Sequence, residues 1–388
     1  MTSNRNVLFL SAVIVYLVGT TEFMLSSIMS PLALAFEVSS EQIPWLISSY
    51  ALAYTLTAPL IGYLSDRIDK RKILLTAILL LSLDSLAIIF SPNFSVAVIF
   101  RVIGGMASAA LVPVIFSLIA DVIKRENQAV AMGSVMMGMT VGIVTGPMLA
   151  GILVQYFSWY SPFILTSLCG LFAFSISWFI LPSSKKNHTY PHSLSCLIQA
   201  NILRLIIAKG LWNGVSVSIF LLSGEIIRQR TALETAEIGI IMGLFGIGLF
   251  IGNALVAKIA KYKLQDATKL ILILLGILVA LVLFITGKLP LVGDCICLLF
   301  IGVALGVASP VSTSLLAKES TKNKGLVLSV SESINNLALL ITIPAFSLLV
   351  TENNLSTLVL SVILIISSAI FLVMATLNLR VRKNRRYR

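Results

Sequence analysis

The stretch GYLSDRIDKRKIL, residues 62–74, places six charged residues within seven positions, between two long apolar runs. The rest of the chain is very different, because 58% of its 388 residues are hydrophobic and only 11% are charged. A soluble domain is nearer to about 45–50% apolar and about 25% charged. The apolar excess extends over the whole chain, which indicates a protein with many membrane-spanning segments.

The apolar runs themselves predict the architecture, since a spanning helix needs about 20 mostly apolar residues. Twelve such runs are present, at residues 7–31, 43–64, 72–91, 95–123, 128–156, 161–182, 200–224, 236–260, 268–287, 290–317, 325–350 and 354–379. The longest polar break, residues 181–196, separates the first six from the last six. We therefore expect an all-α integral membrane protein with a six-helix bundle at 1–182, a cytoplasmic linker at 183–199, a second six-helix bundle at 200–379 and a basic tail at 380–388.

The cations are distributed very unevenly over the expected loops. The N-terminus, the even-numbered loops and the tail hold 22 of the 28 Lys and Arg residues, whereas the odd-numbered loops hold three. By the positive-inside rule both termini face the cytoplasm, in a multi-pass protein of the plasma membrane. The net charge of +12 then needs no nucleic-acid partner, and the KNRRYR tail is expected to lie near anionic lipid.

Chemical motifs give no sign of an enzyme. The sequence shows no Ser/His/Asp set, no metal-ligand cluster and no phosphate-binding loop, so we predict no catalytic activity, no metal and no cofactor. The four cysteines lie in or beside apolar segments and are expected to behave as small hydrophobic residues.

Three acids lie inside the expected spans, where a charge costs at least about 2.5–3.5 kcal/mol. They are Glu22, Asp84 and Glu332. An apolar environment penalises the charged carboxylate, so a buried acid can take up and release a proton near neutral pH. Glu22 and Asp84 are therefore candidate proton-coupling residues, unless each is a protonated acid that only bonds a neighbouring helix. Glu332 lies among serines and asparagines and could instead belong to a wetted gate.

Two cations also lie within or near expected spans. A buried Arg101 needs a partner, and an acid on the first helix or on a neighbouring helix could supply it. The alternative is that Arg101 extends to the outer interface. Lys209 could likewise extend inward to the interface or line a cavity.

The fifth span contains glycines at near-helical spacing, which let helix backbones approach closely. Its Pro147 removes one helix hydrogen bond and kinks the helix. Any tightly packed membrane helix can show such glycines, but the Gly-Pro ending of the run is more specific. The glycines are Gly133, Gly142, Gly146 and Gly151.

Three motifs together resemble those of the major facilitator superfamily, in particular its twelve-helix drug:proton antiporter group. The family's loop signature is Gly-x-Leu-Ala-Asp-Arg-x-Gly-Arg-Lys. This chain matches it at Gly62, Leu64, Asp66, Arg67, Lys70 and Arg71. It departs from the signature at Ser65, which replaces alanine, and at Asp69, which replaces the second glycine. The helix-5 signature Gly-x8-Gly-x3-Gly-Pro-x2-Gly-Gly is matched from Gly133 to Gly151, with Ala150 for one glycine. Arg101, Gly104 and Gly105 resemble the helix-4 signature. TTEF at 20–23 is similar to the sugar-efflux and arabinose-efflux-like branch.

This resemblance implies two pseudo-symmetric six-helix bundles around a cavity that opens alternately to each side. The resemblance and the buried acids together suggest that six residues line this cavity, namely Glu22, Phe23, Arg101, Trp212, Asn213 and Glu332. It also implies a conformational latch between the two halves, formed by Gly62, Asp66, Arg67 and Arg71. The helix-5 pattern of Gly142, Gly146, Pro147 and Gly151 is typical of exporters.

The expected function is therefore proton-coupled efflux of small, partly apolar molecules or drugs by alternating access, as in multidrug resistance. The expected partners are the substrate, protons and the bilayer, and the resemblance implies a monomer. One alternative is a dedicated exporter of a single endogenous compound, such as a sugar or a metal-chelating metabolite. Another is a sensor or scaffold on the same fold that transports nothing.

Overall fold

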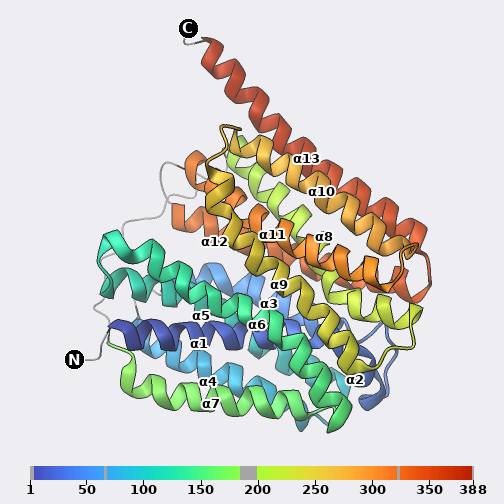
Figure 1. Cartoon of the computed structure of the whole chain (residues 1–388). Helices are drawn as coiled ribbons and strands as arrows, with labels where there is room; N and C mark the ends of the chain where they lie inside the picture. Colours follow the sequence, from blue (N-terminus) through green and yellow to red (C-terminus); the bar gives the residue numbers. More distant parts are fainter. Residues whose placement is uncertain (1–3, 65–67, 184–198, 321–323, 387–388) are drawn as a thin grey trace. The chain divides into compact units, whose positions relative to one another are not determined.

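The computed structural model describes residues 4–64, 68–183, 199–320 and 324–386 (Figure 1). Over these residues the regular structure is entirely helical, with thirteen α-helices, two short 3₁₀ helices and no strand. The predicted all-α fold is confirmed. The α-helices are α1 (Asn4–Phe23), α2 (Met29–Ala35), α3 (Trp45–Leu64), α4 (Lys70–Ile89), α5 (Phe94–Val122), α6 (Gln128–Tyr156), α7 (Ser161–Ile180), α8 (Ala200–Arg230), α9 (Thr235–Ala260), α10 (Asp266–Thr286), α11 (Leu291–Glu319), α12 (Lys324–Thr351) and α13 (Leu355–Arg386).

Eleven helices among the described residues are long and apolar enough to cross a membrane. The remaining predicted span, residues 43–64, corresponds to the 20-residue helix α3. In lipid, where no water is available, a helix satisfies all its backbone polar groups within a single segment. This requirement explains why long apolar runs alone predicted where the helices lie.

The first predicted span, residues 7–31, was wrong as a single helix. The α-helix α1 ends at Phe23, a 3₁₀ helix η1 covers Met24–Ser27, and α2 begins at Met29. The Ser26 hydroxyl donates to the carbonyl oxygen of Phe23 at 2.6 Å, so a side chain competes for the helix's own acceptor. Pro31 has no N–H to donate and falls in the first turn of α2, where none is needed. Glu22 thus lies beside a break in the first helix.

Other helix boundaries also differ from the predicted ones, among them those of α8 and α4. The helix α8 ends at Arg230 and not at residue 224, so its last turns contain charged residues. The helix α4 begins at Lys70 because Asp69 is its N-cap, whose carboxylate accepts from the Arg71 N–H at 3.1 Å.

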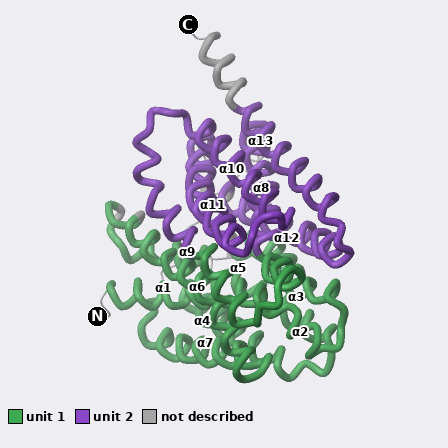
Figure 2. Tube along the Cα trace, turned by 45° about the vertical axis from the view of Figure 1, so that its right-hand side comes forward, with its two compact units in different colours: residues 1–190, 221–246 green, residues 191–220, 247–388 purple. Residues whose placement is uncertain are grey.

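The helices form two compact units (Figure 2). Unit 1 comprises residues 1–190 and 221–246, and in it α1 packs on α6, α3 and α4 pack on α5, and α4 packs on α7. Unit 2 comprises residues 191–220 and 247–388, and in it α10 packs on α11 and α13, and α12 packs on the same two helices. The division into bundles at 182 and 200 stays a prediction.

Candidate functional site

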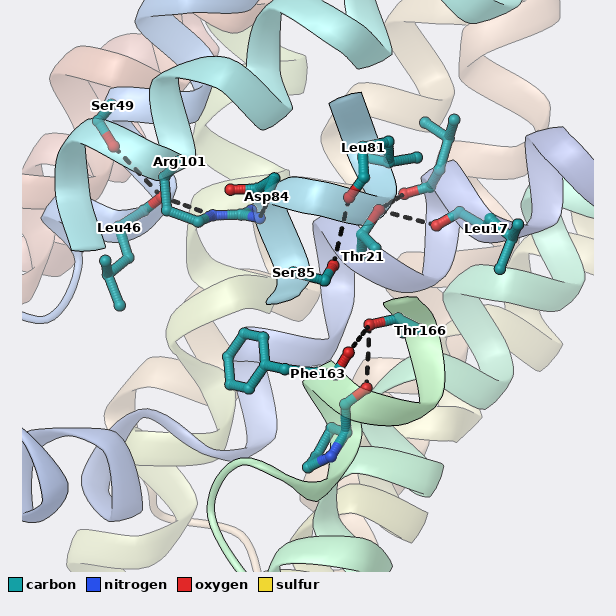
Figure 3. A network of polar contacts seen from close by, with 12 residues as sticks. Leu17, Thr21, Leu46, Ser49, Leu81, Asp84, Ser85, Arg101, Phe163 and Thr166 are labelled. Carbon is teal, nitrogen blue, oxygen red and sulfur yellow. Dashed lines mark hydrogen bonds and ion pairs between the residues drawn. The ribbon is translucent and has the colours of Figure 1, made fainter. Parts of the chain in front are cut away.

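A completely buried ion pair joins α4 and α5 in unit 1 (Figure 3). Arg101 Nη1 lies 2.8 Å from Asp84 Oδ2, and the side chains of Arg101 and Asp84 are 1% and 0% exposed. Arg101 Nε donates to the carbonyl oxygen of Leu46 at 3.3 Å, and the guanidinium lies 4.6 Å from the ring centroid of Tyr50. Arg101 therefore binds an acid of the neighbouring helix and does not extend to the interface.

Two glycines of α5 make room for this arrangement. A side chain at Gly104, one turn after Arg101, would collide with the carboxylate of Asp84. A side chain at Gly105 would collide with the backbone carbonyl of Tyr50 on α3. The sequence Arg-x-x-Gly-Gly thus supplies the counter-charge for Asp84 and the space for two neighbouring helices.

The second carboxylate oxygen of Asp84, Oδ1, is buried and has no hydrogen-bond partner among the residues that the structure describes. A buried acceptor without a partner costs about 1–3 kcal/mol. A proton or a water molecule at this oxygen would remove that cost. Asp84 thus has the chemistry of a group that binds a proton.

Glu22 lies in the last turn of α1, partly exposed and next to the break, and the following residue, Phe23, is buried. Its carboxylate is within electrostatic reach of Tyr50, the residue whose ring packs on Arg101. Tyr50 thus lies between the two candidate proton-coupling acids in this chain of interactions, since it interacts with Glu22 and with Arg101, the partner of Asp84.

The glycine-rich helix α6 packs in register along α1. Side chains at Gly138, Gly142 and Gly146 would meet the backbone oxygens of residues 12, 16 and 20 in turn. Of these three glycines, Gly146 has the most space, because a Cβ added there would lie 3.1 Å from the Thr20 oxygen. The Ser27 hydroxyl of the break donates to the Pro147 carbonyl oxygen at 2.8 Å. The break of the first helix is thus bound to the Gly-Pro position of α6.

The other face of α6 packs equally closely on the part of α9 that belongs to unit 1. A Cβ at Gly151 would lie 2.5 Å from the Thr235 carbonyl oxygen, and one at Gly239 would lie 2.6 Å from that of Pro147. Gly133, in contrast, has nothing within 4 Å of an added Cβ. Close packing therefore accounts for Gly142, Gly146 and Gly151 of the helix-5 pattern but not for Gly133.

A polar network at the end of α8 was missed at the sequence level. Ser30 Oγ donates to Glu225 Oε2 at 2.5 Å, and Arg228 Nη2 donates to the Ser27 carbonyl oxygen at 3.3 Å. Arg228 Nη1 also reaches Thr235 Oγ1 at 3.4 Å, and the Thr235 N–H donates to Gln155 Oε1 at 3.0 Å. The signal that could have found it is the pair of charged residues at positions 225 and 228, one turn apart.

In unit 2 a charged pair joins α8 and α12. Lys209 of α8 donates to Glu332 Oε1 of α12 at 2.7 Å and to Thr313 Oγ1 of α11 at 3.3 Å. The Asn335 amide donates to Glu332 Oε2 at 2.9 Å. The structure thus brings Glu332 together with Lys209, which sequence reasoning had treated separately.

The two other cavity candidates of unit 2 follow Lys209 on α8. Trp212, one turn further on, is fully buried, and its Nε1 has no partner among the described residues. Asn213 is partly exposed.

Of the proposed latch, Asp66 and Arg67 lie outside the described residues, and Gly62 lies in the last turn of α3. Arg71 donates to the Trp178 carbonyl oxygen, and its guanidinium lies 5.9 Å from that indole ring. Lys70 binds Asp121 of α5 at 2.5 Å. The described part of this stretch therefore contacts α5 and α7 of its own unit, and a latch between the halves stays a prediction.

Within the described ranges, no group of three or more His, Cys, Asp or Glu side chains converges on one point. Cys169, Cys295 and Cys297 are free thiols.

Comparison with known proteins matches this chain to a transporter family. The model of the Major Facilitator Superfamily matches residues 8–341. The uncharacterized MFS-type transporter YceJ of Bacillus subtilis (strain 168) is 24% identical over 66% of this chain and 67% of its own length. The inner membrane transport protein YdhP of Escherichia coli (strain K12) is 23% identical over 69% of each chain. MdtD of Pectobacterium atrosepticum, a candidate multidrug resistance protein, is 34% identical over 35% of this chain and 29% of its own.

Some relatives are matched over less than two thirds of their length. The chain spans 66% of YtbD and 55% of YbcL, two further MFS-type transporters of Bacillus subtilis.

Solved structures share the fold over nearly the whole chain. A bacterial homologue of the human lysosomal transporter Spinster has a TM-score of 0.78 at 16% identity, and the match covers 96% of this chain and 97% of that one. A D-xylose-proton symporter has a TM-score of 0.76 at 14% identity, with 95% of each chain covered. The match over residues 8–341, together with this helical fold, shows that the chain belongs to the major facilitator superfamily of multi-pass membrane transporters.

Proposed function

We propose that this chain is a proton-coupled exporter of small, partly apolar molecules, in which Asp84 and Glu22 take up the proton. The observation that carries the proposal is the Asp84–Arg101 pair, buried inside membrane-spanning helices with one Asp84 oxygen that has no partner among the described residues. Such pairs are costly in a membrane and usually serve ion or substrate pathways.

Protonation of Asp84 gives a direct way to drive a conformational change. The proton would neutralise the carboxylate and leave the Arg101 guanidinium buried without its counter-ion. An uncompensated buried charge costs several kcal/mol, so the helices that hold the pair would rearrange until Arg101 meets water or another anion. Release of the proton would restore the pair. Glu22 is a second acid, within electrostatic reach of the Tyr50 that packs on Arg101, and would respond to the same change.

Export, rather than import, is supported by α6. The helix matches the antiporter pattern at Gly142, Gly146, Pro147 and Gly151, and three of these residues are glycines at close backbone contacts. The relative MdtD, although matched over a short segment, is a candidate multidrug resistance protein. We propose that α1 and α6 move together because the glycines and the Ser27–Pro147 bond join them.

The membrane orientation is part of the same proposal. We propose that the protein lies in the inner (cytoplasmic) membrane with both termini in the cytoplasm, because most of its cations lie on that side. Support comes from unit 1, where Asn4 donates to the Val122 carbonyl oxygen at 3.4 Å and Lys70 binds Asp121. The beginnings of α1 and α4 thus lie beside the end of α5, as expected if all three face the cytoplasm.

The remaining parts of the proposal follow the family pattern. The transporter would act as a monomer, with bundles at 1–182 and 200–379 that open alternately to each side. The latch would use Gly62, Asp66, Arg67 and Arg71, and the substrate route would include Glu22, Phe23, Trp212, Asn213 and Glu332.

Accumulation in everted membrane vesicles tests this function. A panel of cationic, neutral and anionic fluorescent compounds is offered with a proton gradient and again after an uncoupler has collapsed it. We expect accumulation of several apolar compounds that needs the gradient and is lost in Asp84→Asn, while Lys318→Gln, at an exposed ion pair with Asp266, behaves as wild type. Accumulation that survives the uncoupler would contradict proton coupling, and a single accepted compound would contradict multidrug export in favour of a dedicated exporter.

A further inference from the structure

The Glu332 carboxylate in unit 2 is bound as a ligand would be. Lys209 Nζ contacts one of its oxygens at 2.7 Å, and the Asn335 amide donates to the other at 2.9 Å. Thr313 Oγ1 holds Lys209 Nζ from a third helix at 3.3 Å. One charged and one neutral donor, each on its own oxygen, suit a planar carboxylate.

The three residues Lys209, Glu332 and Thr313 lie at a similar distance from the ends of their three helices. Lys209 lies nine residues after the start of α8, Glu332 eight residues after the start of α12, and Thr313 six residues before the end of α11. At about 1.5 Å of rise per residue, these positions are roughly two turns from the helix ends. Gly210 permits the approach of α8 to α12, because a Cβ there would lie 2.5 Å from Ile334 Cγ2. The position of Lys209 is therefore set by close helix packing.

The two charges of the pair differ strongly in exposure. The Lys209 side chain is 2% exposed, whereas that of Glu332 is 51% exposed. A buried ammonium needs a counter-ion at all times, but a half-exposed carboxylate can turn away into water at little cost. The two donors, Lys209 and Asn335, thus form the buried part of the site, and Glu332 forms its half-exposed part.

Further polar atoms on the same helices lack partners among the described residues. Trp212 Nε1, Ser331 Oγ and Asn336 Oδ1 are buried and make no hydrogen bond there. Arg101, in contrast, is not available to a substrate anion, since Asp84 and Leu46 already bind it in a fully buried position.

We propose that Lys209 and Asn335 form a carboxylate-binding subsite, for which the Glu332 side chain and a carboxylate of the transported molecule compete. This inference rests on the proposed export function and narrows its substrate class to small organic monocarboxylates with an apolar body. Binding of the substrate carboxylate to Lys209 displaces Glu332, so the buried lysine keeps one negative partner throughout.

Benzoate and its neutral analogue benzamide provide the test on the full-length protein in detergent, at constant ionic strength and pH. Thermal unfolding is followed as either compound is added. We expect benzoate, but not benzamide, to raise the Tm of wild type in a saturable way. In Glu332→Gln the competitor is neutral, so the half-saturating benzoate concentration should fall at least tenfold. In Lys209→Met the response should be lost.

Two variants keep the test specific. Lys269→Met removes another buried lysine of unit 2, paired with Asp266 at 3.5 Å, and should keep the wild-type response. Asn335→Leu removes the second donor and should raise the half-saturating concentration, which gives a readout if Lys209→Met does not fold. Equal responses to benzoate and benzamide, or the same half-saturating benzoate concentration in wild type and Glu332→Gln, would overturn the proposal. No benzoate response in either protein would also overturn it. No proton gradient is present in this assay. A negative benzoate result therefore leaves the proposal of proton coupling through Asp84 standing, and a negative coupling result in vesicles leaves the carboxylate subsite standing.

Discussion

The carboxylate of Asp84 fills the space that a side chain at Gly104 would need. Arg101 lies one turn earlier on the same helix and binds that carboxylate at 2.8 Å. A single turn of α5 therefore supplies both the room for the buried acid and its counter-charge. This relationship gives the Arg-x-x-Gly pattern a physical meaning that the letters alone do not contain.

Replacement of Gly104 tests this relationship. Gly104→Ala forces the Asp84 carboxylate away from Arg101, and overpacking of this kind costs about 1–3 kcal/mol. Gly133→Ala is the matched control, because an added Cβ meets nothing within 4 Å there and alanine is the better helix former. We expect thermal unfolding in detergent to show a clear loss of Tm for Gly104→Ala only. Equal Tm values for the two variants would contradict the packing described.

The ion pair itself is tested by a double-mutant cycle. Asp84→Asn leaves Arg101 buried without a counter-ion and should cost about 3–5 kcal/mol of stability. Asp84→Asn with Arg101→Gln removes both charges and should recover most of that loss, although transport stays abolished. Denaturant unfolding measures each variant. The exposed Lys318–Asp266 pair, with 59% and 23% of the side chains exposed, should show a coupling of only about 0–1 kcal/mol. Strictly additive effects at Asp84 and Arg101 would refute the buried pair.

Asp69 gives a prediction about the charged stretch before α4. The family pattern has glycine here, and in this chain Asp69 is the N-cap of α4. Loss of an N-cap to alanine costs about 0.5–2 kcal/mol, but loss to glycine costs only a few tenths. Asp69→Ala should therefore lower the Tm more than Asp69→Gly does. A larger loss in Asp69→Gly would show that the carboxylate does not act as a cap.

The network at the end of α8 gives a prediction about movement. If transport requires the Ser30–Glu225 contact to separate, a short bifunctional thiol reagent between Ser30→Cys and Glu225→Cys should block it. The native cysteines are replaced first. Export should stop in proportion to the cross-linked fraction and return after reduction, while each single-cysteine variant stays active. Full export by the cross-linked protein would show that this contact persists throughout the cycle.

Much of the fold could be predicted from the sequence, because apolar length alone identifies helices that must satisfy their own backbone in lipid. The break after Phe23 could not, since one of the bonds at the break reaches Pro147 of another helix. From the sequence, the acid that binds Arg101 could lie on the first helix or on a neighbouring helix. The structure shows that it is Asp84, whose side chain extends from α4 toward α5. Lys209 and Glu332 are 123 residues apart, and a single sequence has no signal for their contact.

The most direct test of proton-coupled export is the movement of protons that accompanies substrate. Purified protein is reconstituted into liposomes that contain a pH-sensitive dye, and a compound found to accumulate in everted vesicles is added. We predict substrate-dependent proton flux in wild type and its loss in both Glu22→Gln and Asp84→Asn. Proton flux that remains at the wild-type rate in both variants would contradict the account.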